Sequence, residues 1–187
     1  MRVTFDLSDD DLKYFKRALK EVRVRAKHMT EDEVVKAARA LLDQMLCVSA
    51  PAFVCERMSK LSDLIAMLED SEWALTGRDR ERVVRSLTYF AEPDDIIPDK
   101  VPVLGFLDDA IMVELVVGEL EHELSAYADF CGFRKTREER FGPDEDPATR
   151  EEWISARRQS LHARMRRRRS RRKPRGGSGG RSPIALW

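Results

Sequence analysis

Residues 93–109 read PDDIIPDKVPVLGFLDD, a stretch that interrupts the chain between two helical regions. Proline removes a backbone donor and fixes φ, so neither a long helix nor a central strand can run through it. Its seven apolar residues do not suit a solvated loop, and its aspartates can accept backbone hydrogen bonds near the prolines. We therefore predict an ordered, buried connection that fixes how the helices on either side of it meet.

Apolar residues recur at helical spacing on both sides of this connection, which predicts an all-α protein. We expect a compact bundle of about five helices within residues 1–132. They lie at about 8–27, from 30 to a break marked by Ser49 and Pro51, and at about 52–69, 79–91 and 106–130. Ser8 with Asp11 and Thr30 with Glu33 fit capping boxes at the first two helix starts. Gly132 is expected to end the fifth helix.

The remaining chain is expected to leave the bundle. Residues 133–147 are charged and contain Pro143 and Pro147, so we interpret them as a linker. Residues 148–187 predict a basic helix, capped by Thr149 and Glu152, that frays near residue 170. Beyond it the Arg/Gly-rich sequence cannot bury itself, which predicts a disordered tail.

Charge is distributed unevenly along a chain whose formal net charge is zero. Residues 157–187 contain 12 basic residues and no acidic one, which leaves 22 basic and 34 acidic residues in the first 156. An acidic body with a basic tail is typical of an interaction arm. No apolar run is long enough to span a membrane and the N-terminus has no secretory apolar region. With Cys47, Cys55 and Cys131 interpreted as reduced, buried thiols, we predict a cytoplasmic protein, with peripheral attachment at the inner face of the membrane as the alternative.

The stretch at residues 93–109 resembles the YkvA-like family, a bacterial domain of unknown function (DUF1232). The resemblance covers about residues 85–120 and implies a helical unit with no established activity, some relatives being membrane-associated. It implies no catalytic residue, and the glutamates after the motif make the following helix too charged for a bilayer span. The matching positions, which we expect to be structural, are Pro93, Asp95, Ile97, Pro98, Asp99, Pro102, Leu104, Gly105, Asp108 and Asp109.

Two acidic groups invite a metal site, and in both cases we favour a structural role. Asp94, Asp95, Asp99, Asp108 and Asp109 could hold Mg²⁺, but no base, nucleophile or phosphate loop accompanies them, so we expect helix caps and turn contacts. Glu119-x-x-His122, with Glu114 and Glu123, resembles half of a di-iron site, whose second Glu-x-x-His element is missing. We therefore predict no enzyme, no catalytic residue, no cofactor and no metal.

The basic tail is the strongest indication of function. Arginine forks bind phosphate and stack on bases, so we predict non-specific binding of RNA or DNA. One alternative is an anionic membrane surface, with Trp153 and Trp187 as interfacial anchors. Another is that the tail folds back onto the acidic body or only keeps the protein soluble; an enzyme using the aspartates is a distant third class. No small-molecule substrate or oligomeric state is predicted, and the expected polyanion-binding residues are Arg164, Arg166, Arg167, Arg168, Arg169, Arg171, Arg172, Lys173, Arg175 and Arg181.

Overall fold

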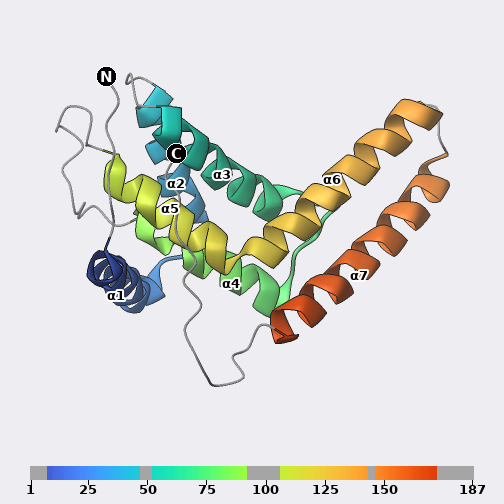
Figure 1. Ribbon diagram of the computed structural model, residues 1–187. Coiled ribbons are helices and arrows are strands. Elements are labelled where there is room, and N and C mark those ends of the chain that lie inside the picture. The colour runs from blue at the N-terminus through green and yellow to red at the C-terminus, as the bar shows by residue number, and fades with distance from the viewer. Residues whose placement is uncertain (1–7, 47–51, 92–105, 143–145, 172–187) are drawn as a thin grey trace.

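The computed structural model describes residues 8–46, 52–91, 106–142 and 146–171, and these residues are all-α (Figure 1). They form seven α-helices and two short 3₁₀ helices with no strand among them, which confirms the predicted fold class. The proline-rich connection, apart from its last four residues, and the predicted disordered tail beyond residue 171 lie outside the described residues. The elements are α1 (Asp9–Arg25), η1 (Ala26–His28), α2 (Glu31–Leu46), α3 (Ala52–Glu69), α4 (Gly77–Leu87), η2 (Thr88–Ala91), α5 (Leu107–Glu119), α6 (Glu121–Phe141) and α7 (Pro147–Arg171).

Both predicted N-terminal capping boxes are confirmed. Ser8 N donates to Asp11 Oδ2 at 2.9 Å, and Asp11 N donates to Ser8 Oγ at 3.2 Å. At the start of α2, Thr30 N donates to Glu33 Oε2 at 2.7 Å, and Glu33 N donates to Thr30 Oγ1 at 3.3 Å. These caps satisfy backbone donors that a helix start leaves free, so the local sequence is sufficient to set both starts.

One continuous hydrophobic core connects the helices, and α5 lies within it with most of its residues buried. Trp73, in the connection between α3 and α4, is fully buried. The centroid of its ring system lies 5.7 Å from that of Tyr127, 5.2 Å from that of Phe130 and 4.3 Å from that of His162. Trp73 therefore joins the bundle to α6 and α7.

The predicted single helix over 106–130 is wrong, because the chain breaks at Leu120 and α6 begins there with a change of direction (Figure 1). Arg82 Nη2 donates to the carbonyl oxygen of Glu119 at 2.8 Å, which supplies a donor to a carbonyl at the end of α5. The predicted stop at Gly132 is also wrong. Helix α6 continues to Phe141, because one glycine costs a helix only about 1 kcal/mol and packing against α7 outweighs it.

Residues 133–141 are therefore helical and do not form the predicted linker. Helix α7 is capped by Asp146, not by Thr149 with Glu152 as predicted, since Thr149 N donates to Asp146 Oδ2 at 2.9 Å. Pro147 occupies the first helical position, where its missing N–H costs nothing. The prediction of buried thiols is wrong for Cys55, which is exposed.

The C-terminal half of α6 and the N-terminal half of α7 lie side by side and project from the bundle (Figure 1). Arginines and aromatic rings alternate between them. Arg137 lies over the rings of Phe141 and Trp153, at 4.2 Å and 5.1 Å from their centroids. Arg157 lies 4.9 Å from the centroid of Phe133, whose ring meets that of Trp153 edge-on. Cation–π contacts of this kind stabilise the projecting pair in addition to the apolar packing of Ile154.

Candidate functional site

The predicted polyanion-binding arginines divide into two sets according to the side of α7 on which they lie. Arg166 and Arg169 face the bundle. Arg166 Nε donates to Asp79 Oδ2 at 2.7 Å, and Arg169 Nη2 donates to Asp79 Oδ1 at 2.6 Å. Arg169 Nη1 also donates to Glu123 Oε1 at 2.8 Å, and Arg164 pairs with Asp129. These three arginines are therefore neutralised by the body of the protein.

The two acids that pair with Arg166 and Arg169 are almost completely buried, with the Asp79 and Glu123 side chains 5% and 1% exposed. Asp79 lies in the first turn of α4 and Glu123 in the first turn of α6. Burial by itself would raise the pKa of Asp79, but hydrogen bonds and charge from Arg166 and Arg169 outweigh it and lower that pKa. Arg82 also approaches Glu123, with 3.2 Å between its Nε and Oε1. Asp79 is therefore ionised and pairs with two guanidinium groups, so this contact fixes the end of α7.

The second set, Arg167, Arg168 and Arg171, lies on the exposed side of the last turns of α7. Within the part of the chain that the structure describes, none of the three forms an ion pair or hydrogen bond. Arg168 and Arg171 border a shallow depression of about 480 Å³ beside His122. Their guanidinium groups are therefore available to an external anion.

Four further predicted cations, Arg172, Lys173, Arg175 and Arg181, lie outside the described residues. The same holds for eight of the ten motif positions, Pro93, Asp95, Ile97, Pro98, Asp99, Pro102, Leu104 and Gly105, and for Asp94. The two motif residues that are described, Asp108 and Asp109, are buried in the first turn of α5. Tyr89 donates its hydroxyl to Asp108 Oδ2 at 3.4 Å, a contact consistent with a structural role.

The acids near His122 do not converge on it. Glu119 Oε2 lies 2.6 Å from Arg23 Nη2 across the bundle, and Glu114 lies 3.5 Å from Arg57. Glu123 instead accepts from Arg169. Within the described ranges, no three His, Cys, Asp or Glu side chains are grouped so that they could hold a metal ion. Glu114, Glu119 and Glu123 are therefore each engaged by an arginine in this structure.

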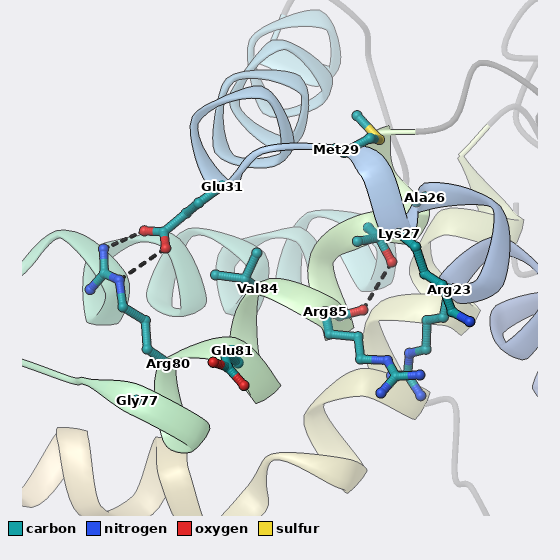
Figure 2. A pocket seen from close by; sticks show the side chains of 11 residues that line it. Arg23, Ala26, Lys27, Met29, Glu31, Gly77, Arg80, Glu81, Val84 and Arg85 are labelled. Carbon is teal, nitrogen blue, oxygen red and sulfur yellow. Dashed lines mark hydrogen bonds and ion pairs between the residues drawn. The ribbon is translucent and has the colours of Figure 1, made fainter.

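A basic groove that the sequence analysis did not identify runs between α1 and α4. It consists of two hollows of about 550 and 560 Å³ that share Arg23, Glu81 and Arg85. Figure 2 shows the first hollow, where Arg23 and Arg85 reach the same end while Arg80 pairs with Glu31 at the other. The complete lining is Lys20, Arg23, Val24, Ala26, Lys27, Met29, Glu31, Gly77, Arg78, Arg80, Glu81, Arg82, Val84, Arg85, Ser86, Thr88, Glu119 and Arg169.

The signal for this groove was present in the sequence as two basic stripes. Lys20, Arg23 and Lys27 follow a helical spacing of three and four, and Arg78, Arg82 and Arg85 follow four and three. Each stripe alone looks like an ordinary solvated helix face. Only the folded arrangement, in which α1 packs on η2 and α5, brings the two stripes into the lining of the same groove.

The described helices and their ion pairs define an all-α protein whose C-terminal helix docks partly through buried carboxylates. Within this chain, residues 83–115 match a family model described as "Protein of unknown function (DUF1232)", which confirms the resemblance seen in the sequence. The match begins in α4 and ends in α5. The searches of curated proteins and of solved structures returned no match. None of the helices that the structure describes is long and apolar enough to cross a membrane.

Proposed function

We propose that this protein is a non-enzymatic binding module whose arginine-rich C-terminal segment binds the phosphates of RNA or DNA without sequence specificity. One observation carries the proposal: Arg167, Arg168 and Arg171 are exposed and unpaired on one side of α7, while their neighbours are held by buried acids. Residues three and four apart share a helix face, so these arginines form one patch. Guanidinium forks bind phosphate oxygens in pairs, and such contacts depend weakly on base sequence.

The acidic body favours a defined point of contact. The first 156 residues hold 22 basic and 34 acidic residues, so most of that surface repels a polyanion. The patch at the end of α7 continues in the sequence into further arginines, which concentrates positive charge at one end of the chain. A strand of nucleic acid would first meet this end.

Attachment to an anionic membrane is the second candidate, and one of its predicted anchors has another role. Trp153 packs between α6 and α7, where it contacts Phe133 and lies within reach of Arg137 and Arg150. An indole engaged in this way is not free to insert into a lipid interface. The geometry therefore favours nucleic acid over lipid as the partner.

The test compares the unmodified full chain with the variant Arg167→Gln/Arg168→Gln/Arg171→Gln. Affinity for a labelled 20-nucleotide RNA is measured by fluorescence anisotropy over a series of salt concentrations. We expect weaker binding. We also expect the slope of the logarithm of the binding constant against the logarithm of the salt concentration to become less negative by roughly 2, because three phosphate contacts are lost. The control, Lys16→Gln/Arg17→Gln/Lys36→Gln, removes the same charge from exposed, unpaired positions on α1 and α2 and should change the slope little.

Equal affinities and equal slopes for the unmodified chain and the α7 variant would overturn the proposal. Flotation with phosphatidylserine vesicles is run in parallel. Vesicle binding that the α7 substitutions abolish, without any RNA binding, would assign the same patch to a membrane surface instead.

A further inference from the structure

We propose that the groove between α1 and α4 is a second binding surface for the same polyanion and that it accepts a single-stranded segment. This inference rests on the proposed function, because it extends the path of the strand that the end of α7 binds. It assigns a role to basic residues in the body of the protein, outside the predicted arm.

The groove contains cations that no described acid neutralises. Lys20, Lys27, Arg78 and Arg85 are exposed, and the side chain of none of them forms an ion pair or hydrogen bond within the described ranges. The lining of the groove contains one carboxylate without a described partner, that of Glu81. Unpaired cations that face each other across a hollow produce a positive potential that attracts an anion.

Other cations of the groove are already held in position. Arg23 is mostly buried, and its guanidinium is fixed by Glu119 at 2.6 Å and by Ser86 Oγ at 3.3 Å. A fixed guanidinium loses little side-chain entropy when it meets a phosphate, which favours binding. The groove therefore contains a cation that is fixed by an ion pair, Arg23, together with several cations whose side chains are unpaired.

The groove leads to the end of α7. Arg169, which Asp79 and Glu123 hold, also lines the same hollow as Lys20 and Arg78. Arg169 lies within one helical turn of Arg168 and Arg171, which form part of the exposed patch. A strand bound to that patch can therefore continue past Arg169 into the groove.

The shape and lining of the groove favour a single strand. Ala26, Met29 and Val84 give its first hollow an apolar lining beside the cations (Figure 2). A strand with unpaired bases can place its phosphates against the cations and its bases against apolar side chains. A duplex presents its phosphates on a rigid convex surface, which does not enter a hollow of this size.

The test uses the full chain and the variant Lys20→Gln/Arg78→Gln/Arg85→Gln, with the same labelled RNA and the control variant described above. We expect the slope of the logarithm of the binding constant against the logarithm of the salt concentration to become less negative by roughly 2, because three single-strand phosphate contacts are lost. Glu81→Gln should act in the opposite direction and tighten binding by about two- to fivefold, because it removes the unpaired carboxylate. All variants should keep the melting temperature of the unmodified chain, since the substituted side chains form no ion pairs.

The combined outcomes separate this inference from the proposed function. Here a loss means weaker RNA binding with a less steep salt dependence. A loss in both the groove variant and the α7 variant supports the groove inference and the proposed function. Loss in the α7 variant alone overturns the groove inference and leaves the proposed function standing. Loss in the groove variant alone overturns the proposed function and makes the groove the binding site. No loss in either overturns both, and an equal effect of the groove substitutions on a duplex of the same sequence would overturn the assignment to a single strand.

Discussion

His162 lies where α7 meets the connection between α3 and α4, with its ring edge-on against Trp73. Burial lowers the pKa of His162 most, the positive charge of Arg166 and Arg158 lowers it further, and Asp79 opposes the shift. Its Nε2 is buried and has no hydrogen-bond partner among the described residues. The neutral imidazole is therefore the form that suits this contact.

A lowered pKa predicts a loss of stability in acid. The unfolded chain takes up a proton near the ordinary histidine value of about 6.5, whereas folded His162 resists it, so the free energy of unfolding falls as pH drops below about 6.5. A single proton contributes at most about 1.4 kcal/mol per pH unit. Denaturant unfolding at pH 7.5 and 5.5 should show a smaller loss for His162→Phe than for the unmodified chain.

His28→Gln serves as the control, because it removes an exposed imidazole and leaves the contact of His162 with Trp73 in place. That variant should keep the pH dependence of the unmodified protein. If His162→Phe lost as much stability between the two pH values as the unmodified chain, the neutral contact with Trp73 would not be what acid disrupts.

At the scale of the elements, helix α6 shows two glycines in opposite roles. Gly132 is helical and exposed, and a Cβ at that position would meet no atom within 4 Å. Gly142 ends the helix with φ 71° and ψ −176°, a conformation that residues with a side chain rarely adopt. The two positions therefore predict opposite effects of the same substitution.

Gly132→Ala should stabilise the protein by about 0.5–1 kcal/mol, because alanine loses less backbone entropy in a helix. Gly142→Ala should destabilise it by about 1–3 kcal/mol, because alanine is strained at positive φ. Thermal unfolding followed by circular dichroism measures both. A lower melting temperature for Gly132→Ala would contradict the continuous helix.

The starts of α1 and α2 were predictable from the sequence, whereas the end of α5 and the end of α6 were not. The boxes at Ser8 and Thr30 are local, since both partners lie within one turn, and both were correctly placed. At the break at Leu120, the carbonyl of Glu119 accepts from Arg82 of another helix, a partner that no local pattern indicates. Gly132 was misread as a stop because the compensating packing comes from α7.

For the whole molecule, the arrangement of charge decides how α7 docks. Few apolar residues of α7 are buried, namely Ile154, Leu161 and Met165, and Asp79 holds two of its arginines. The sequence showed an acidic body and a basic tail and left contact between them as one alternative. It could not show which acids would be used, because Asp79 and Glu123 are far from α7 in the chain and adjoin it only after folding.

Asp79→Asn should therefore have two effects at once. It should lower the free energy of unfolding by about 1–3 kcal/mol, because Arg166 and Arg169 lose a buried partner. It should also tighten RNA binding, because Arg166 is released to meet phosphates and Arg169 keeps only Glu123 as its partner. Denaturant unfolding and fluorescence anisotropy measure the two effects on the same preparation.

Asp32→Asn makes the same change of charge at an exposed, unpaired position on α2 and should leave both quantities nearly unchanged. An Asp79→Asn protein that is less stable but binds RNA no more tightly would show that the ion pairs serve the fold alone.

The pairing of Arg166 and Arg169 with acids of the same chain also sets the conditions under which they can be used. A tethered competitor acts at an effective concentration, typically on the order of millimolar for a short tether, that dilution of the protein does not change. We expect an external polyanion to displace Asp79 and Glu123 only when its local phosphate concentration exceeds this internal value. On the proposed function, the protein would then bind phosphates presented densely along a strand and would not bind the same phosphates scattered in solution.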